Sequence, residues 1–149
     1  MTIPCPGKQT NIICKEQAIP EFPHMLFGGA NDGISYFNAT LYLQNTKSSS
    51  SVEDFLTQYQ VQIEALTNAY EIKPENICIQ NNEGHFLIDG SLCYLFIAFV
   101  DPNFLAYMMD RINDMFVHGF CVSDTYVFGL AKRRLPKEAL QAIINNGTN

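Results

Sequence analysis

Tryptophan and a long hydrophobic run are both missing from this chain of 149 residues. Its longest apolar run, residues 92–100, is far shorter than the about 20 residues that a membrane-spanning helix needs. The opening residues, MTIPCPGKQT, lack the basic start and the apolar segment of a secretory signal peptide. We therefore expect no membrane partner and a cytoplasmic protein.

Charged residues are scarce, at 16% of the chain, and their balance is acidic, with a formal net charge of −6. Nucleic-acid binding depends on basic surfaces that neutralise phosphates, so nucleic acid is not an expected partner. The basic run at 132–137 is interpreted as a solvated segment before a helix, with an adaptor surface for an acidic protein as the alternative. Low charge favours a surface covered by a partner or by a second copy, so a homodimer is expected.

Closely paired cysteines and clustered metal ligands are also missing. The five cysteines, Cys5, Cys14, Cys78, Cys93 and Cys121, form no CxxC pair. His118 and Cys121 would supply only half of the four ligands that zinc needs. We expect no metal and no cofactor, and the spacing favours free thiols in a reducing compartment. Cys121 remains a weak candidate for a reactive thiol, because a nearby histidine can lower a thiol pKa.

The N-terminal residues differ in composition from the rest of the chain. Residues 1–33 hold four of the seven prolines and four of the nine glycines. Each proline biases the residue before it towards extended geometry. We predict an N-terminal extended arm over 1–33, which is not a separate domain, and a single α+β domain over 34–149.

Two segments dominate the predicted sheet. Residues 35–44 alternate between an apolar set and a set of tyrosines and small polar side chains, which is typical of a half-buried strand. Residues 91–100 are apolar at nearly every position, as is typical of a central strand. Further strands are predicted over 76–81, 85–89 and 121–132.

Helix starts are marked by capping residues. Ser51 followed by Asp54 forms a capping box, and Asp101-Pro102 combines a favoured N-cap with a proline in the first turn. Apolar side chains recur every three or four residues after both starts. The helices are predicted over 52–70, 102–118 and 136–145.

Strands and helices thus follow the order strand, helix, strand, strand, helix, strand, with a helix at the C-terminus. This order predicts a ferredoxin-like split βαβ-βαβ antiparallel sheet with two helices on one face, plus the N-terminal arm and the C-terminal helix. The alternative is another α+β layout in which 76–89 forms a separate hairpin.

Helices on one face would leave the other face of the sheet rich in aromatic side chains. The residues predicted to meet a ligand or an interface are Tyr36, Asn38, Tyr42, Tyr94 and Tyr126. The arm, a second copy or a ligand could cover this face. We expect a non-enzymatic interaction or ligand-binding module that self-associates or binds a small molecule or peptide through this aromatic face.

The alternative function is a small cofactor-free enzyme with a pocket between the sheet face and the arm. A histidine would act there as the acid or base, and it must lie within hydrogen-bond reach of the proton that it transfers. His85 and His118 are the weak candidates for this role, since both lie near the end of a predicted element.

Overall fold

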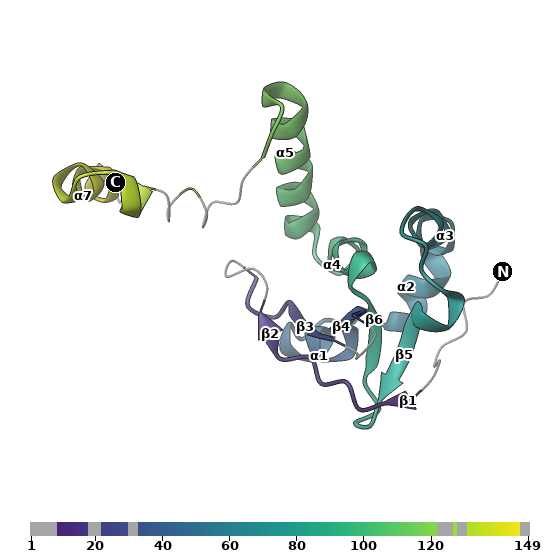
Figure 1. The fold of residues 1–149 in the computed structure, drawn as a ribbon. Helices are drawn as coiled ribbons and strands as arrows, with labels where there is room; N and C mark the ends of the chain where they lie inside the picture. Colours follow the sequence, from purple (N-terminus) through teal and green to yellow (C-terminus); the bar gives the residue numbers. More distant parts are fainter. Residues whose placement is uncertain (1–8, 18–21, 30–32, 122–126, 128–130, 147–149) are drawn as a thin grey trace. The chain divides into compact units, whose positions relative to one another are not determined.

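The structure is a computed structural model, and it describes residues 9–17, 22–29, 33–121, 127 and 131–146 (Figure 1). The chain divides into two compact units, Met1–Ala106 and Tyr107–Asn149. Strands and helices both occur, so the predicted α+β class is confirmed.

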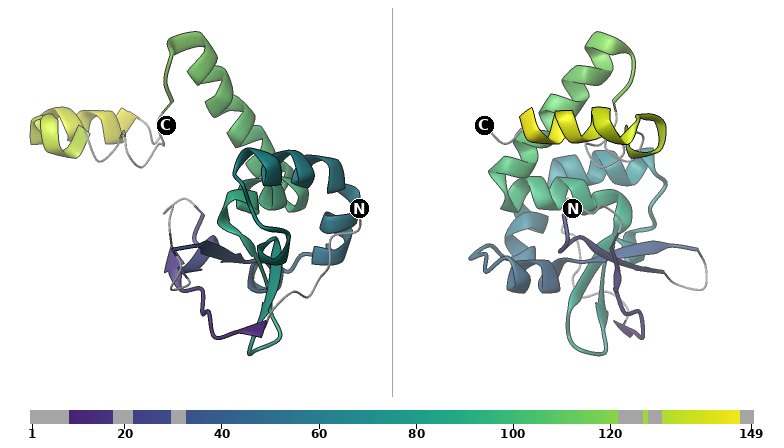
Figure 2. Two further views of the ribbon diagram at one scale, coloured as in Figure 1. Left: turned by 45° about the vertical axis from the view of Figure 1, so that its right-hand side comes forward. Right: turned by 90° about the vertical axis from the view of Figure 1, so that its left-hand side faces the viewer.

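The first unit is built on a sheet of six short strands in the order β1-β5-β6-β4-β3-β2. The strands are β1 (Gln9–Thr10), β2 (Glu16–Gln17), β3 (Leu26–Gly29), β4 (Ser35–Asn38), β5 (Cys78–Asn81) and β6 (Phe86–Asp89). β1 pairs parallel with β5, and every other pairing is antiparallel. β5 and β6 form a hairpin (Figure 2). Three strands therefore come from the segment predicted as an extended arm.

The predicted strand over 35–44 is wrong beyond its first four residues. β4 ends at Asn38, and helix α1 (Ala39–Asn45) follows at once. The Asn38 side chain caps this helix, because its Oδ1 accepts a hydrogen bond from the Leu41 amide at 2.9 Å. Ala39 and Tyr42 are the buried residues of α1, so the two-residue alternation of β4 gives way to helical spacing.

The predicted central strand over 91–100 is also wrong, because these residues are helical. A short 3₁₀ turn η2 (Gly90–Leu92) leads into helix α4 (Cys93–Val100). The most deeply buried side chains are Leu92, Cys93, Phe96 and Ile97, a spacing that belongs to a helix. A short run of uniform hydrophobicity carries no period, so its sequence alone does not distinguish a strand from a helix. The ferredoxin-like split βαβ topology is accordingly not confirmed.

Other predicted elements are confirmed. The helix over 52–70 is present as α2 (Val52–Gln58) and α3 (Gln60–Ala69), with a break at Tyr59, and Ser51 caps it through the Asp54 amide at 3.1 Å. The 3₁₀ turn η1 (Pro74–Asn76) precedes β5. Helices α5 (Pro102–His118) and α7 (Lys137–Asn146) match their predictions within a residue, as do β5 and β6 within two.

The predicted last strand over 121–132 falls mostly outside the described residues. Where the structure describes it, Val127 and residues 131–134 are helical. Alanine, lysine and arginine, which occupy 131–134, are all strong helix formers. The strand prediction is therefore wrong at these positions.

The core of the first unit joins the sheet to helices α1, α2 and α4 through aromatic rings. Phe96 lies at the centre, with its ring centroid 5.8 Å from Phe37, 6.1 Å from Tyr42 and 5.1 Å from Phe55. A second cluster joins Tyr36, Ile79 and Leu87 to Cys14. Since Tyr36 and Phe37 are adjacent on β4, their side chains lie on opposite faces of the sheet, and both faces are covered.

One cysteine departs from the expectation of free thiols. Cys78 is disulfide-bonded, whereas Cys14, Cys93 and Cys121 are free. Among the described residues, no single helix combines the length and the apolar composition needed to cross a membrane. The pair formed by residues 90–100 and α5, bent by 119°, meets both criteria together.

Candidate functional site

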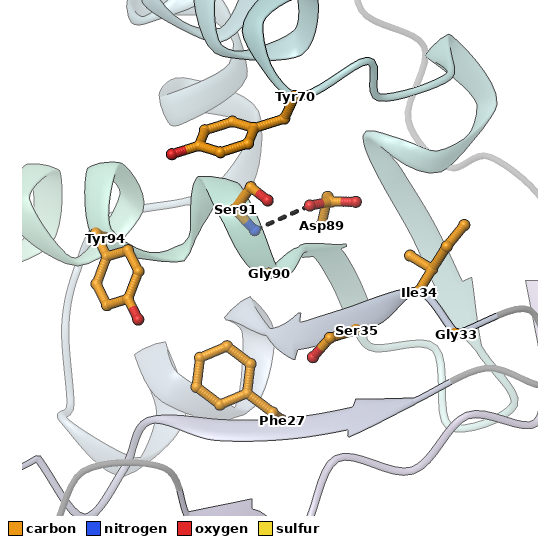
Figure 3. A pocket seen from close by; sticks show the side chains of 9 residues that line it. All are labelled: Phe27, Gly33, Ile34, Ser35, Tyr70, Asp89, Gly90, Ser91 and Tyr94. Carbon is orange, nitrogen blue, oxygen red and sulfur yellow. Dashed lines mark hydrogen bonds between the residues drawn. The ribbon is translucent and has the colours of Figure 1, made fainter.

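The first unit contains a hollow of about 450 Å³ at one end of its central strands (Figure 3). Strands β3, β4 and β6 supply its base, and the ends of α3 and α4 supply its rim. The described lining residues are Phe27, Gly33, Ile34, Ser35, Tyr70, Asp89, Gly90, Ser91 and Tyr94. Their side chains are mainly aromatic or small, which leaves open space between the rings.

Tyr70 is held at the rim by the way in which α3 ends. Glu71, the next residue, adopts the left-handed conformation with φ 54°. The Tyr70 amide donates to the Leu66 carbonyl, and the Ile72 amide donates to the Thr67 carbonyl, both at 2.9 Å. This closure is the Schellman pattern, in which a left-handed residue ends the helix. It turns the chain sharply and fixes the position from which the Tyr70 ring reaches over the hollow (Figure 3).

Asp89 ends β6, opposite Tyr36 of β4, and lies beside the hollow. Only 9% of its surface is exposed. One carboxylate oxygen, Oδ1, accepts a hydrogen bond from the Ser91 amide at 2.9 Å, which starts η2. Gly90 lets the chain pass close to β4 here, since a Cβ at this position would lie 3.1 Å from the Ser35 carbonyl oxygen. The sequence Asp-Gly-Ser therefore converts a strand end into a helix start and places a carboxylate in the hollow.

Tyr94 lies on the first turn of α4 and is 44% exposed. Its neighbours Cys93, Phe96 and Ile97 point into the core, so helical geometry directs Tyr94 towards the hollow. Partial burial raises the pKa of the Tyr94 phenol, with further contributions from Cys93 and Tyr70. The phenol is therefore neutral near pH 7, and its hydroxyl can donate a hydrogen bond.

Three of the five predicted interface residues are buried inside the first unit. Tyr36 is 3% exposed, and its carbonyl accepts a bond from the Cys14 thiol at 3.4 Å. Asn38 caps α1 through Oδ1 and donates from its amide nitrogen to His85 Nδ1 at 3.1 Å. Tyr42 packs on Phe37 with ring centroids 5.6 Å apart. Tyr94 lines the hollow, and Tyr126 lies outside the described residues.

None of the weak catalytic candidates is among the described residues that line the hollow. Besides the bond from Asn38, His85 Nδ1 lies 3.6 Å from a carboxylate oxygen of Glu83. His118 ends α5 in the second unit, and Cys121 is an exposed free thiol. No group of three or more metal-ligating side chains occurs among the described residues.

Sequence reasoning missed Phe27, Tyr70 and Asp89 as residues that share one hollow. Tyr70 fell at the end of the helix predicted over 52–70, and this helix in fact ends at Ala69. The Asp-Gly-Ser sequence at 89–91 was the available signal, since an aspartate followed by glycine and serine favours a turn or a helix start. Phe27 carries no such signal, because only the pairing of β3 with β4 brings it to this end of the sheet.

Comparison of the chain with protein-family models, with curated proteins and with solved structures found no match.

Proposed function

We propose that this chain is a binding module that holds a small molecule, or a side chain of a partner protein, in the hollow at Asp89 and Tyr94. The observation that carries the proposal is the lining itself: three aromatic rings and one carboxylate around about 450 Å³. Ligand sites are typically concave and mainly apolar, with a few polar groups that fix orientation, and volumes of about 300–1,000 Å³ are usual.

Binding is favoured over the alternative of acid–base catalysis by the residues at the hollow. The enzyme hypothesis required a histidine in the pocket, and no histidine or cysteine is among the described residues that line it. The proposed binding site also differs from the one predicted from the sequence. The prediction used the aromatic face of a strand at 35–44, whereas the hollow lies at the start of α4. Tyr94 is common to both.

The homodimer and the cytoplasmic location remain predictions from the sequence. Tyr36 and Tyr42 are buried within one chain, so a homodimer would have to use other residues. The disulfide at Cys78 weighs against a cytoplasmic location, because disulfides persist mainly in oxidising compartments. The ferredoxin-like topology receives no support from the strand order described above.

A fragment screen followed by backbone NMR tests the proposal. In a ¹⁵N-labelled sample, fragments that bind should shift the amide signals of Ser35, Gly90, Ser91 and Tyr94 together. The variant Ser35→Phe fills the hollow and should abolish these shifts. Ser49→Phe is the matched control, because it places the same ring on an exposed loop before α2. Fragment shifts that never gather at these four residues, or that survive Ser35→Phe, would refute the proposal.

A further inference from the structure

Asp89 is largely buried, and its carboxylate has one hydrogen bond from the described residues. Its Oδ1 accepts from the Ser91 amide, and no hydrogen bond or ion pair from the described residues reaches Oδ2. The side chain is more than nine-tenths buried. Burying a charged group is costly unless an opposite charge or several hydrogen bonds compensate for the lost hydration. This carboxylate therefore keeps one oxygen open to a positively charged partner.

The described part of the chain supplies no such partner at the hollow. None of the described residues that line it is a lysine, an arginine or a histidine. The other polar side-chain groups of the described lining are the hydroxyls of Ser35, Ser91, Tyr70 and Tyr94, none of which carries a positive charge. Anions are disfavoured at this site because they would approach Asp89 without any cation to offset the repulsion.

Three aromatic rings add to the preference for a cation. Tyr70 and Phe27 approach the hollow from opposite sides, and Tyr94 stands at a third side (Figure 3). The face of an aromatic ring carries partial negative charge and attracts organic cations, most familiarly in the aromatic cages that recognise quaternary ammonium groups. These rings also offer apolar surface to methyl or methylene groups.

A metal ion does not fit the same lining. Calcium takes six to eight oxygen ligands, with carboxylates prominent among them, whereas the described side chains of the hollow offer one carboxylate and the four hydroxyls of Ser35, Ser91, Tyr70 and Tyr94. The faces of the aromatic rings provide no ligands for this ion. The chemistry that matches both the carboxylate and the rings is a positive charge with apolar substituents.

We propose that the hollow binds an alkylammonium group, with Asp89 as its counter-charge and the rings of Phe27, Tyr70 and Tyr94 around its methyl or methylene groups. This inference rests on the proposed function and assigns its ligand class. The group can belong to a free small molecule or to a lysine side chain, methylated or not, of a partner protein.

Choline and its neutral isostere 3,3-dimethylbutan-1-ol form the test pair, because they share shape and differ in charge. Titration followed by NMR of the full chain should show saturable binding of choline at Ser91 and Tyr94, at least tenfold tighter than that of the alcohol. Equal or tighter binding of the alcohol would overturn the assigned ligand class and leave the binding function standing. If neither choline nor the alcohol binds, the assigned ligand class is overturned. The binding function is then decided by the fragment screen alone.

Variants distinguish the contribution of the Asp89 charge to choline affinity from that of the aromatic rings. Asp89→Asn keeps an oxygen for the Ser91 amide and removes the charge, so choline affinity should fall at least tenfold while alcohol affinity stays the same. Glu53→Gln, an exposed change on α2, is the control for net charge and should leave both affinities unchanged. Undiminished choline binding by Asp89→Asn would overturn the proposal.

The exposed ring of Tyr94 offers a second route if Asp89→Asn does not fold. Tyr94→Phe keeps the aromatic face and should bind choline nearly as well as the native chain. Tyr94→Leu keeps apolar bulk without the ring and should bind choline about threefold more weakly, as expected for an exposed cation–π contact. Equal binding by both variants would refute the contribution of this ring.

A trimethyllysine peptide, acetyl-Gly-Lys(Me₃)-Gly-amide, distinguishes the two sources of the group. Tighter binding of the peptide than of choline assigns the hollow to a protein segment. Tighter binding of choline assigns it to a free small molecule. Both results support the alkylammonium proposal, and binding of neither contradicts it.

Discussion

Replacing Phe96 by alanine is the most direct test of whether residues 93–100 form a helix. Phe96 is 0% exposed, and Tyr94 is 44% exposed. In helix α4 these two side chains lie on different faces, one in the core and one at the hollow. In a strand they would share one face, because side chains two residues apart point the same way.

The expected loss for Phe96→Ala follows from its surroundings. Truncation of a fully buried phenylalanine typically lowers the free energy of unfolding by about 3–5 kcal/mol. Phe96 contacts Phe37, Tyr42 and Phe55, and these ring pairs place it in the upper part of that range. Tyr94→Ala should lower the free energy of unfolding by no more than about 1 kcal/mol, as is usual for half-exposed side chains.

Urea unfolding followed by far-UV circular dichroism and tyrosine fluorescence measures both values. A domain of this kind has a free energy of unfolding of about 5–15 kcal/mol, so Phe96→Ala can leave little folded protein. Phe96→Leu then serves as the milder change, with an expected loss of about 1–2 kcal/mol. Losses of equal size for Tyr94→Ala and Phe96→Ala would refute the helical arrangement.

Two further predictions concern groups that the structure buries. Burial raises the pKa of Cys14 from 9.0 to about 11, and burial, with Asp101 and Cys93, raises the pKa of Tyr42 from 10.0 to about 12. As the pH rises, each group loses its proton at a lower pH in the unfolded chain than in the folded chain. The stability that the two buried, protonated groups confer is therefore complete below about pH 9 and is lost by about pH 12. The free energy of unfolding, measured with urea, should fall by about 2 kcal/mol per group over this range. A free energy of unfolding that is constant from pH 8 to 11.5 would contradict this. Asn38→Ala should lower the free energy of unfolding by about 1–2 kcal/mol, because it removes the cap of α1 and the bond to His85. Asn38→Ser, which keeps a capping oxygen, should recover most of the loss, and equal losses for both variants would argue against the cap.

Local signals in the sequence were sufficient where one residue determines one structural event. Ser51 placed the start of α2, and Asp101-Pro102 placed the start of α5. These features act through the backbone of a few adjacent residues. Their prediction needs no knowledge of what packs against them.

In residues 35–44 and 91–100, tertiary packing determines whether the chain forms a strand or a helix. Alternation over 35–44 suits a strand, yet the Asn38 cap and the packing of Tyr42 against Phe37 and Phe96 make the second half helical. Residues 93–100 are apolar on all sides, so their period is visible only in the burial of Phe96 and Ile97. Tertiary packing overrides weak local preference in both places.

The sequence alone determined the α+β composition, the starts of α2, α5 and α7, and the acidic net charge. It also placed Tyr94 among the residues of interest, although for a reason that the fold did not support. Only the tertiary structure brought together Phe27, Tyr70 and Asp89, which lie on separate strands and helices far apart along the chain. A hollow is a property of distances between elements, and strand pairing and helix packing set those distances after local structure has formed.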